Sequence, residues 1–277
     1  MKKIPLYYWA GHKNFGDELS KYIVEKISGG ECFFVKRNAK RKLLAIGSIL
    51  DRSSAFSLSD IWGSGFLRRD QFKIRFFPIG KNLKYYYSQL FCKSTVHAVR
   101  GPLSRDLLIK AGFSVPEIYG DPAILMPKFY SPKNIEKLHD IGIILHHTHE
   151  TPEILSEVEN RGWKLISILR EGEQEIHDFI DEVVSCKKIF STSLHGIILA
   201  QVYGIPAQWI RLAGKEIHPD EGFKFHDYFL GAGQEVQKSL YVRSLMDINE
   251  NFVPPKINAF TDLDKLLNSF PKKYLKG

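Results

Sequence analysis

The sequence predicts an α/β protein built from two doubly wound, Rossmann-like domains that face each other across a cleft. Short apolar segments of strand length alternate with segments of helical spacing along most of the 277 residues, a rhythm typical of parallel sheets covered by helices. Each predicted strand also runs into small or polar residues, as strands do where an open sheet forms a ligand crevice. The segment 126–137 contains two prolines. We place the boundary there and define the domains as 1–127 and 128–277.

The first domain begins with a predicted strand at 4–9 and a polar loop at 11–16. Apolar residues at 19, 23, 24 and 27 then predict a helix from Asp17 to Ser28. Asp17 is expected at its N-cap, a position that favours Asp without any catalytic role. Further strands are expected at 42–46, 59–62 and 95–99, followed by a helix at 103–111 with Pro102 in its first turn.

In the second domain, strands are expected at 140–146, 163–167, 188–190 and 207–210, with helices at 152–160 and 174–186. The tail at 261–275 has the apolar spacing of an amphipathic helix. Its default position is packed on the body of the protein, the first domain included. The alternative is contact with a membrane surface through Lys272, Lys273 and Lys276.

Composition and charge limit the classes of partner. The formal charge of +8 is spread over short clusters, whereas nucleic-acid binding favours a continuous basic stripe or a known motif, so no nucleic-acid partner is expected. An anionic small substrate or an anionic membrane surface explains the sign of the charge equally well. The three cysteines lack C-x-x-C spacing and predict reduced thiols. Without a signal-peptide core or an apolar run of about 18 residues, a cytoplasmic protein is expected, with peripheral contact at the inner face of the membrane as an option.

The most informative stretch is 191–206, where a predicted strand runs into small polar residues, a His-Gly pair and an apolar run ending at Pro206. The pattern predicts a buried parallel strand whose carboxyl end opens onto a helix, with His195 in the first helical turn. Backbone N–H groups at such a helix start bind anions, and an imidazole there exchanges protons near neutral pH. The alternative is a buried His195 satisfied by a backbone carbonyl.

The run 146–149 contains three histidines. Because neighbouring residues on a strand alternate between faces, only His147 and His149 would share a side. No Cys or carboxylate stands at ligand spacing from them. We therefore expect no metal site.

Several aromatic residues are candidates for stacking on a sugar ring. Trp9 is expected in the core instead, whereas for Trp62, Phe66 and the tyrosines at 85–87 both core packing and stacking remain open. The segment 223–228 is dense in aromatics and is expected to form a lid or a wall of the cleft.

Several segments, in order over most of residues 7–231, resemble the polysaccharide pyruvyl transferase family, most of all its exopolysaccharide (succinoglycan-type) branch. They are Asn14–Asp17, Trp62–Gly65, Val99–Arg105 with Leu108 and Gly112, Tyr119–Ala123, Ser191–Pro206 and Phe223–Tyr228. His146 matches a family histidine at a strand end that lines the cleft. Members of this family resemble GT-B glycosyltransferases in fold.

The resemblance implies phosphoenolpyruvate as donor, a sugar as acceptor and no further cofactor. The product would carry a cyclic pyruvate ketal that bridges two hydroxyls, often O4 and O6 of a hexose. The acceptor would be a precursor of a bacterial surface glycan, commonly a lipid-linked oligosaccharide on the cytoplasmic leaflet.

Ketal formation from an enol phosphate needs an acid for the methylene carbon, a base for the attacking hydroxyl and donors that hold phosphate and carboxylate. We expect His195 to perform acid–base chemistry and Asp17 or Asp121 to act as the base, although a cap or a turn explains either aspartate as well. Arg100 is expected to hold the phosphate or carboxylate of the donor. The remaining candidate substrate-binding residues are Asn14, Gly16, Ser64, His146, Ser191, Ser193, Gly196 and Lys224.

One position departs from the family pattern. Many members carry an arginine two positions before the histidine, where this chain has Ser193, although the exopolysaccharide branch also has Ser-Leu-His-Gly. The missing cation must come from elsewhere, with Arg100 and Lys224 as the nearest candidates, or the donor differs. Two alternatives therefore stay open, a GT-B glycosyltransferase that uses a sugar nucleotide and a non-catalytic glycan-binding protein of the same fold.

Overall fold

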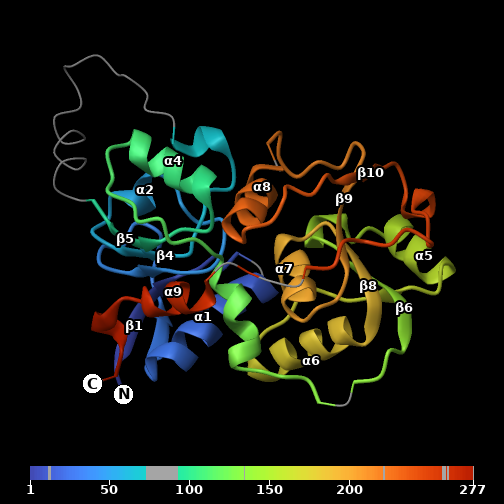
Figure 1. Ribbon diagram of the computed structural model, residues 1–277, viewed down its shortest axis with the longest axis horizontal. Coiled ribbons are helices and arrows are strands. Elements are labelled where there is room, and N and C mark those ends of the chain that lie inside the picture. Colours follow the sequence, from blue (N-terminus) through green and yellow to red (C-terminus); the bar gives the residue numbers. More distant parts are fainter. Residues whose placement is uncertain are drawn as a thin grey trace.

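The computed structural model describes residues 1–11, 14–72, 93–133, 135–220, 222–257, 260 and 262–276. The tyrosines at 85–87 lie outside the described residues. The described chain forms two parallel five-stranded sheets flanked by helices, which lie side by side (Figure 1). The predicted α/β fold with two doubly wound units is confirmed. Within the described ranges, no helix combines the length and apolar character that crossing a bilayer requires.

The N-terminal unit contains the sheet with strand order β2-β1-β3-β4-β5. Its strands are β1 (Lys3–Tyr7), β2 (Glu31–Phe34), β3 (Leu43–Leu44), β4 (Asp60–Trp62) and β5 (Thr95–Ala98). Its helices are α1 (Phe15–Ser28), α2 (Arg52–Ala55) and α4 (Pro102–Lys110). Because the chain leaves β1 for β2 on one side and returns to β3 on the other, the topological switch point lies between β1 and β3.

The C-terminal unit repeats this topology with the order β10-β9-β8-β6-β7. Its strands are β6 (His139–Ile144), β7 (Lys164–Leu165), β8 (Cys186–Ser191), β9 (Ala207–Leu212) and β10 (Leu240–Val242). Its helices are α5 (Pro152–Asn160), α6 (Glu173–Val184), α7 (Leu194–Val202) and α8 (Gly222–Gly231). The switch point lies between β6 and β8, so the crevice of this sheet is expected beyond Ile144 and Ser191.

The start of α1 differs from the sequence prediction. Asn14, with extended backbone, accepts the Gly16 N–H through Oδ1 at 2.9 Å and is the N-cap. The expectation that Asp17 caps the helix is therefore wrong. Asn is as good a cap as Asp, and its use at position 14 places Asp17 inside the first turn with its carboxylate free of that task.

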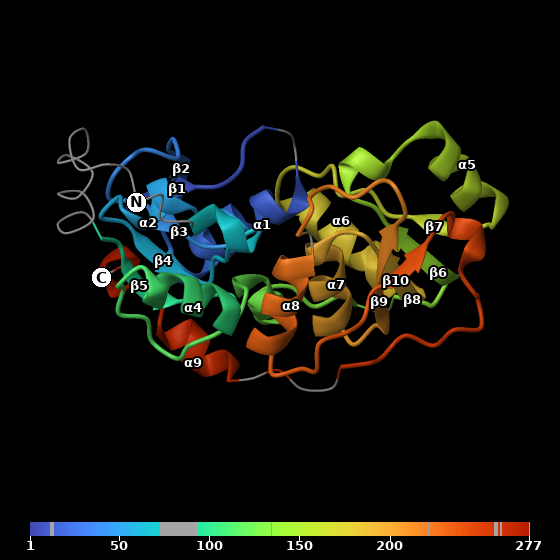
Figure 2. The same cartoon turned by 90° about the horizontal axis from the view of Figure 1, so that it is seen from above.

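The two units share one hydrophobic core. The largest cluster of buried side chains includes residues of β1, α1, α6 and α7. Phe15 at the start of α1 stacks on Phe179 of α6 with ring centroids 4.0 Å apart, and its N–H donates to the Ile168 carbonyl at 2.8 Å. Helix α7 lies in the middle of the molecule (Figures 1 and 2). The N-termini of α1 and α7, from different units, are thereby held in fixed positions.

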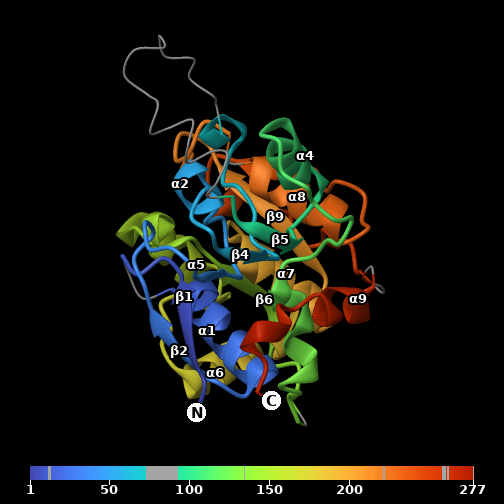
Figure 3. The ribbon, with the colours of Figure 1, turned by 90° about the vertical axis from the view of Figure 1, so that its left-hand side faces the viewer.

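The C-terminal segment returns to the N-terminal unit. Helix α9 (Leu263–Asn268) receives a hydrogen bond from Trp62 Nε1 to the Leu266 carbonyl at 3.0 Å, and both chain ends lie close together (Figure 3). The predicted helix at 261–275 is therefore too long. Pro271 lacks the backbone N–H that would continue the helix, and the chain finishes in a 3₁₀ turn at Lys272–Tyr274.

Candidate active site at the junction of the two units

His195 stands where the two units meet. It lies in the first turn of α7, directly beyond β8 at the switch point of the C-terminal sheet. A Cβ atom at Gly16 would lie only 2.1 Å from His195 Nδ1, so the imidazole rests on the first turn of α1. On its other side, His195 Nε2 is 3.7 Å from Asp121 Oδ2. The structure thus brings together His195 of one unit with Gly16, Asp17 and Asp121 of the other.

Asp121 has two tasks, one for each carboxylate oxygen. Oδ1 accepts the Ala123 N–H at 3.1 Å and caps the 3₁₀ helix Pro122–Lys128. Oδ2 faces His195 Nε2, and both of these buried atoms lack a hydrogen-bond partner among the described residues. A fully buried carboxylate this close to an imidazole can stabilise the positive charge that the ring gains in a proton transfer. The two sequence alternatives for Asp121, capping and chemistry, therefore do not exclude each other.

Asp17 is the second carboxylate near His195. Its Oδ1 accepts the Trp9 backbone N–H at 2.9 Å. Burial raises the pKa of Asp17 to about 7, against the opposing effects of this hydrogen bond and of His195. A carboxyl group with a pKa near the working pH is suited to take up and release a proton.

A second polar cluster lies beyond β6 and β8. The His146 N–H donates to Thr192 Oγ1 at 2.7 Å, and the His149 Nδ1 lies 3.0 Å from the same oxygen. Burial is the main cause that lowers the pKa of His146 to about 3, with further lowering by Lys224, His147, His149 and His218. His146 is therefore a neutral imidazole in an electropositive environment, a setting that favours an anion.

His149 is bound within the protein. Its Nδ1 contacts Thr192 and its Nε2 lies 2.8 Å from the Lys215 carbonyl oxygen. Both ring nitrogens are thus engaged, and the segment 147–149 is a 3₁₀ turn instead of a strand end. Thr192, which holds both His146 and His149, was missed in the sequence. Its only signal was its place between Ser191 and Ser193 in the most informative motif.

The structure corrects the expectation for Arg100. Its guanidinium is fully buried and forms an ion pair with Asp227 of α8, with Nη2 3.0 Å from Oδ2. It also donates to Ser48 Oγ at 2.6 Å and to the Phe66 carbonyl. Because the guanidinium is surrounded by these partners, Arg100 joins the N-terminal unit to α8 in this structure and presents no open face to a donor.

Three glycines make this ion pair possible. A Cβ atom added to Gly65 would lie 2.4 Å from the guanidinium carbon of Arg100. A Cβ atom added to Gly101 would lie 1.8 Å from the Asp227 carbonyl oxygen, and one added to Gly231 would lie 2.0 Å from the Arg100 carbonyl oxygen. The segment 223–228 is accordingly the packed helix α8, with Phe223, Phe225 and Asp227 buried, and not a lid.

Other candidate residues form the framework of the site. Ser64 donates to the Ala45 carbonyl at 2.6 Å, and Ser191 donates to the Ile144 carbonyl at 3.0 Å and accepts the Ser193 N–H. A Cβ atom at Gly196 would lie 2.5 Å from Ser191 Oγ, so this glycine lets α7 approach the sheet. Ser193 is the N-cap of α7, yet its hydroxyl makes no capping hydrogen bond. It remains a candidate for contact with a ligand.

The aromatic candidates also separate. Trp62 and Phe66 are fully buried and belong to the core. Trp9, in contrast, is 48% exposed, and the expectation of a core position is wrong.

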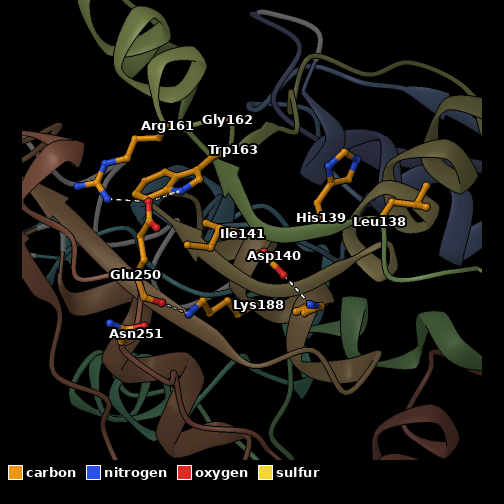
Figure 4. A pocket seen from close by; sticks show the side chains of 11 residues that line it. Leu138, His139, Asp140, Ile141, Arg161, Gly162, Trp163, Lys188, Glu250 and Asn251 are labelled. Carbon is orange, nitrogen blue, oxygen red and sulfur yellow. Dashed lines mark hydrogen bonds and ion pairs between the residues drawn. The ribbon is translucent and has the colours of Figure 1, made fainter.

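A cavity of about 510 Å³ lies elsewhere, at the edge of the C-terminal sheet where β6, β7 and β8 begin (Figure 4). Most of its charged groups are paired with one another: Lys187 with Asp140, and Arg161 with Glu250, to which Trp163 Nε1 also donates. Lys188 donates instead to the backbone carbonyls of Glu250 and Phe252. Ligands of open α/β sheets bind at the opposite, carboxyl edge. We therefore place the candidate active site at His195.

Comparisons with known proteins show the family to which the chain belongs. The chain is 30% identical over 241 residues to an uncharacterised protein of Acanthamoeba polyphaga mimivirus, an alignment that covers 84% of this chain and 76% of the viral one. A crystal structure of an uncharacterised Klebsiella pneumoniae protein is similar in fold, with a TM-score of 0.50 and 13% identity over 87% of this chain and 92% of that one. The family model for polysaccharide pyruvyl transferases matches residues 14–211, which include His195, Asp17 and Asp121. The chain belongs to the polysaccharide pyruvyl transferase family.

Proposed function

We propose that the protein transfers the pyruvyl group of phosphoenolpyruvate to two hydroxyls of one sugar residue, forming a cyclic ketal and releasing inorganic phosphate. The observation that carries this proposal is the convergence of His195 with Asp17 and Asp121 from the opposite unit. Family membership supports the reaction class. The acceptor would be a bacterial surface-glycan precursor, such as a lipid-linked oligosaccharide at the cytoplasmic face of the membrane.

The proposed reaction balances without an oxidant or a cofactor. One sugar hydroxyl adds to C2 of the enol while a proton goes to the methylene carbon C3, which becomes a methyl group. The second hydroxyl then displaces the phosphate from C2. Of the two hydroxyl protons, one replaces the proton delivered to C3 and the other leaves with inorganic phosphate.

Two of the three site residues carry out these proton transfers, and the third supports them. His195 Nδ1 faces the first turn of α1, the same turn that carries Asp17. We assign His195 as the acid for C3 and Asp17 as the base for the attacking hydroxyl, because paired groups in different environments suit opposite roles. Asp121 places a buried carboxylate oxygen 3.7 Å from Nε2, and we assign it to stabilise the charged imidazole and not to act as the base.

The donor carries a phosphate and a carboxylate and needs cationic partners. Lys224, whose charge lowers the pKa of His146, would supply the positive charge in place of the arginine that many family members carry at the position of Ser193, and the neutral His146 would supply a hydrogen-bond donor. The backbone N–H groups at the start of α7 and the Ser193 hydroxyl lie at the same end of the sheet. A helix N-terminus adds to the binding of an anion there.

The test is incubation of the purified protein with phosphoenolpyruvate and, separately, with sugar nucleotides, in the presence of candidate oligosaccharide acceptors. Acceptor-dependent phosphate release together with the mass gain of a pyruvate ketal supports the proposal. His195→Ala should abolish both, whereas His139→Ala, at the opposite edge of the sheet, should not. Nucleotide release would identify a glycosyltransferase instead. Absence of both reactions, and of thermal stabilisation by phosphoenolpyruvate, would leave a glycan-binding protein.

A further inference from the structure

Trp9 is the exposed tryptophan of this protein. The chain has four tryptophans, and the other three, Trp62, Trp163 and Trp209, are buried, whereas the Trp9 side chain is 48% exposed. Exposing an indole costs hydrophobic free energy. An exposed aromatic ring beside a reaction centre is a frequent means of holding a ligand.

The position of Trp9 is fixed relative to the proposed base. Its backbone N–H donates to Asp17 Oδ1 at 2.9 Å. The backbone from which the indole extends is therefore in direct contact with that carboxylate. Gly11 lies against the ring, because a Cβ atom there would be 2.8 Å from indole atoms Cε2 and Cζ2. The lack of a side chain at Gly11 lets the backbone of this residue lie against the indole.

Tyr8 precedes Trp9 in the chain and has an aromatic neighbour of its own. The Tyr8 ring packs edge-on against Phe34 with centroids 5.3 Å apart. Burial is the main cause that raises the pKa of Tyr8, and the negative charges of Glu18 and Asp17 are among those that raise it further. The phenol and the Asp17 carboxylate therefore interact electrostatically.

We propose that the acceptor sugar binds here, with the C–H face of a pyranose ring stacked on the Trp9 indole and its hydroxyls directed to Asp17. A pyranose has an apolar face of axial C–H groups and a rim of hydroxyls, which matches an indole bordered by a carboxylate. This inference rests on the proposed function, because it gives the attacking hydroxyl its route to the base. It assigns the donor to the Lys224 side and the acceptor to the Trp9 side.

The first test measures binding without any donor, so it stands even if pyruvyl transfer fails. Acrylamide quenching of tryptophan fluorescence should report mainly on Trp9, because the other three indoles are buried, and Trp9→Phe should lose most of the quenching. Methyl β-galactopyranoside, methyl β-glucopyranoside and methyl β-mannopyranoside are the probes. Protection of Trp9 from acrylamide by at least one of them is expected. Absence of protection by all three overturns the proposal.

The second test uses steady-state kinetics with the acceptor identified by ketal formation. Trp9→Ala should raise KM for the acceptor at least fivefold and leave KM for phosphoenolpyruvate unchanged, and Trp9→Phe should restore part of the loss. The control is Phe33→Ala, since Phe33 is 45% exposed on the edge strand β2 and faces away from its neighbour Phe34. If Trp9→Ala still transfers the pyruvyl group with an unchanged KM for the acceptor, the proposal that the sugar stacks on Trp9 is wrong, whereas the proposed function still holds.

Discussion

The Cα of Gly16 lies against the imidazole of His195, so closely that a methyl group at position 16 would fall 2.1 Å from Nδ1. Gly16 is the second residue of α1 and has ordinary helical backbone. Its lack of a side chain therefore serves the contact with His195 and not the conformation of the helix.

Gly16→Ala is accordingly expected to displace the His195 ring without unfolding the protein. Alanine is favoured over glycine inside a helix by about 1 kcal/mol, which offsets part of the strain. We expect the melting temperature to stay near that of the wild type while kcat falls by about 10²–10⁴-fold, the usual contribution of a positioned acid–base group. Differential scanning calorimetry and phosphate release measure the two quantities.

The matched control is Gly222→Ala in α8. A Cβ atom there would meet its nearest neighbour, a Trp209 ring atom, at 3.4 Å, an ordinary contact. This variant should retain activity. Wild-type turnover in Gly16→Ala would contradict the placement of His195 at the reaction centre.

The raised pKa of Asp17 predicts a pH profile. A general base must be ionised, so the acidic limb of kcat/KM should rise with pH through about 7. Asp17→Asn keeps an oxygen for the Trp9 N–H but cannot accept a proton, and should lower kcat/KM by about 10²–10⁴-fold. The measurement is kcat/KM of the wild type and of Asp17→Asn as a function of pH. If Asp17→Asn stays active and its kcat/KM still rises with pH as in the wild type, Asp17 is not the general base.

The same group makes a prediction about stability. The folded state raises the pKa of Asp17 from 3.8 to about 7, so between these values the folded protein holds a proton that the unfolded chain has released. The stability that Asp17 contributes is therefore fully present below pH 4 and is lost as pH rises through 7. The free energy of unfolding of Asp17→Asn, relative to that of the wild type, should therefore rise between pH 5 and pH 8, by on the order of 1 kcal/mol after solvent screening. Thermal unfolding at both pH values tests the sign.

The sequence was sufficient for the features that depend on local order. Strands that end in small or polar residues, and a histidine at the start of a buried helix, indicated the sheet edge at which His195 lies. The two aspartates proposed as catalytic do lie beside it, Asp121 at 3.7 Å. Parallel sheets place the residues that follow their strands at one edge, so spacing alone carried this information.

Features that depend on distant partners escaped the sequence. Arg100 had the chemistry of an anion ligand, but its partner Asp227 is 127 positions away and no local pattern links them. Trp9 looked like a core residue because the strand was expected to extend to it, whereas β1 ends at Tyr7. Asn14 and Asp17 both suit an N-cap, and only the structure separates their roles.

The Arg100–Asp227 ion pair predicts a stability effect. Arg100→Ala would leave Asp227 buried without its counter-charge, which costs about 3–5 kcal/mol. The Ser104 N–H donates to Asp227 Oδ1 at 2.9 Å. Arg100→Met combined with Asp227→Asn should recover much of this loss, since the double variant removes the lone charge and keeps an acceptor for that N–H. Chemical denaturation of both variants gives the free energies of unfolding.

Arg105→Ala is the control for this prediction. Arg105 lies on α4 near Arg100 but forms its ion pair, at 3.2 Å, with Glu117, whose side chain is 72% exposed, so the loss of this pair should cost less than about 1 kcal/mol. A normal unfolding transition in Arg100→Ala, with a raised KM for phosphoenolpyruvate, would instead return Arg100 to the donor site.

The final prediction concerns proton uptake on anion binding. The positive charge of Lys224 helps to hold the pKa of His146 at about 3, after the larger effect of burial. An anion bound between them would offset that charge and raise the pKa of His146, so binding and protonation must favour each other. Sulfate is a suitable probe because its own charge is constant over the relevant range.

Sulfate should therefore bind more tightly as pH falls from about 6 to about 4, toward the pKa of His146, and His146→Gln should remove most of this dependence. Lys224→Met should weaken binding about tenfold at every pH, an electrostatic loss of about 1.4 kcal/mol. Lys187→Met should change neither, because Lys187 pairs with Asp140 at the opposite edge of the sheet. Titration calorimetry in buffers of different ionisation enthalpy counts the protons directly. If sulfate binds with no proton uptake in the wild type, the anion does not sit beside His146, and the donor must be held elsewhere.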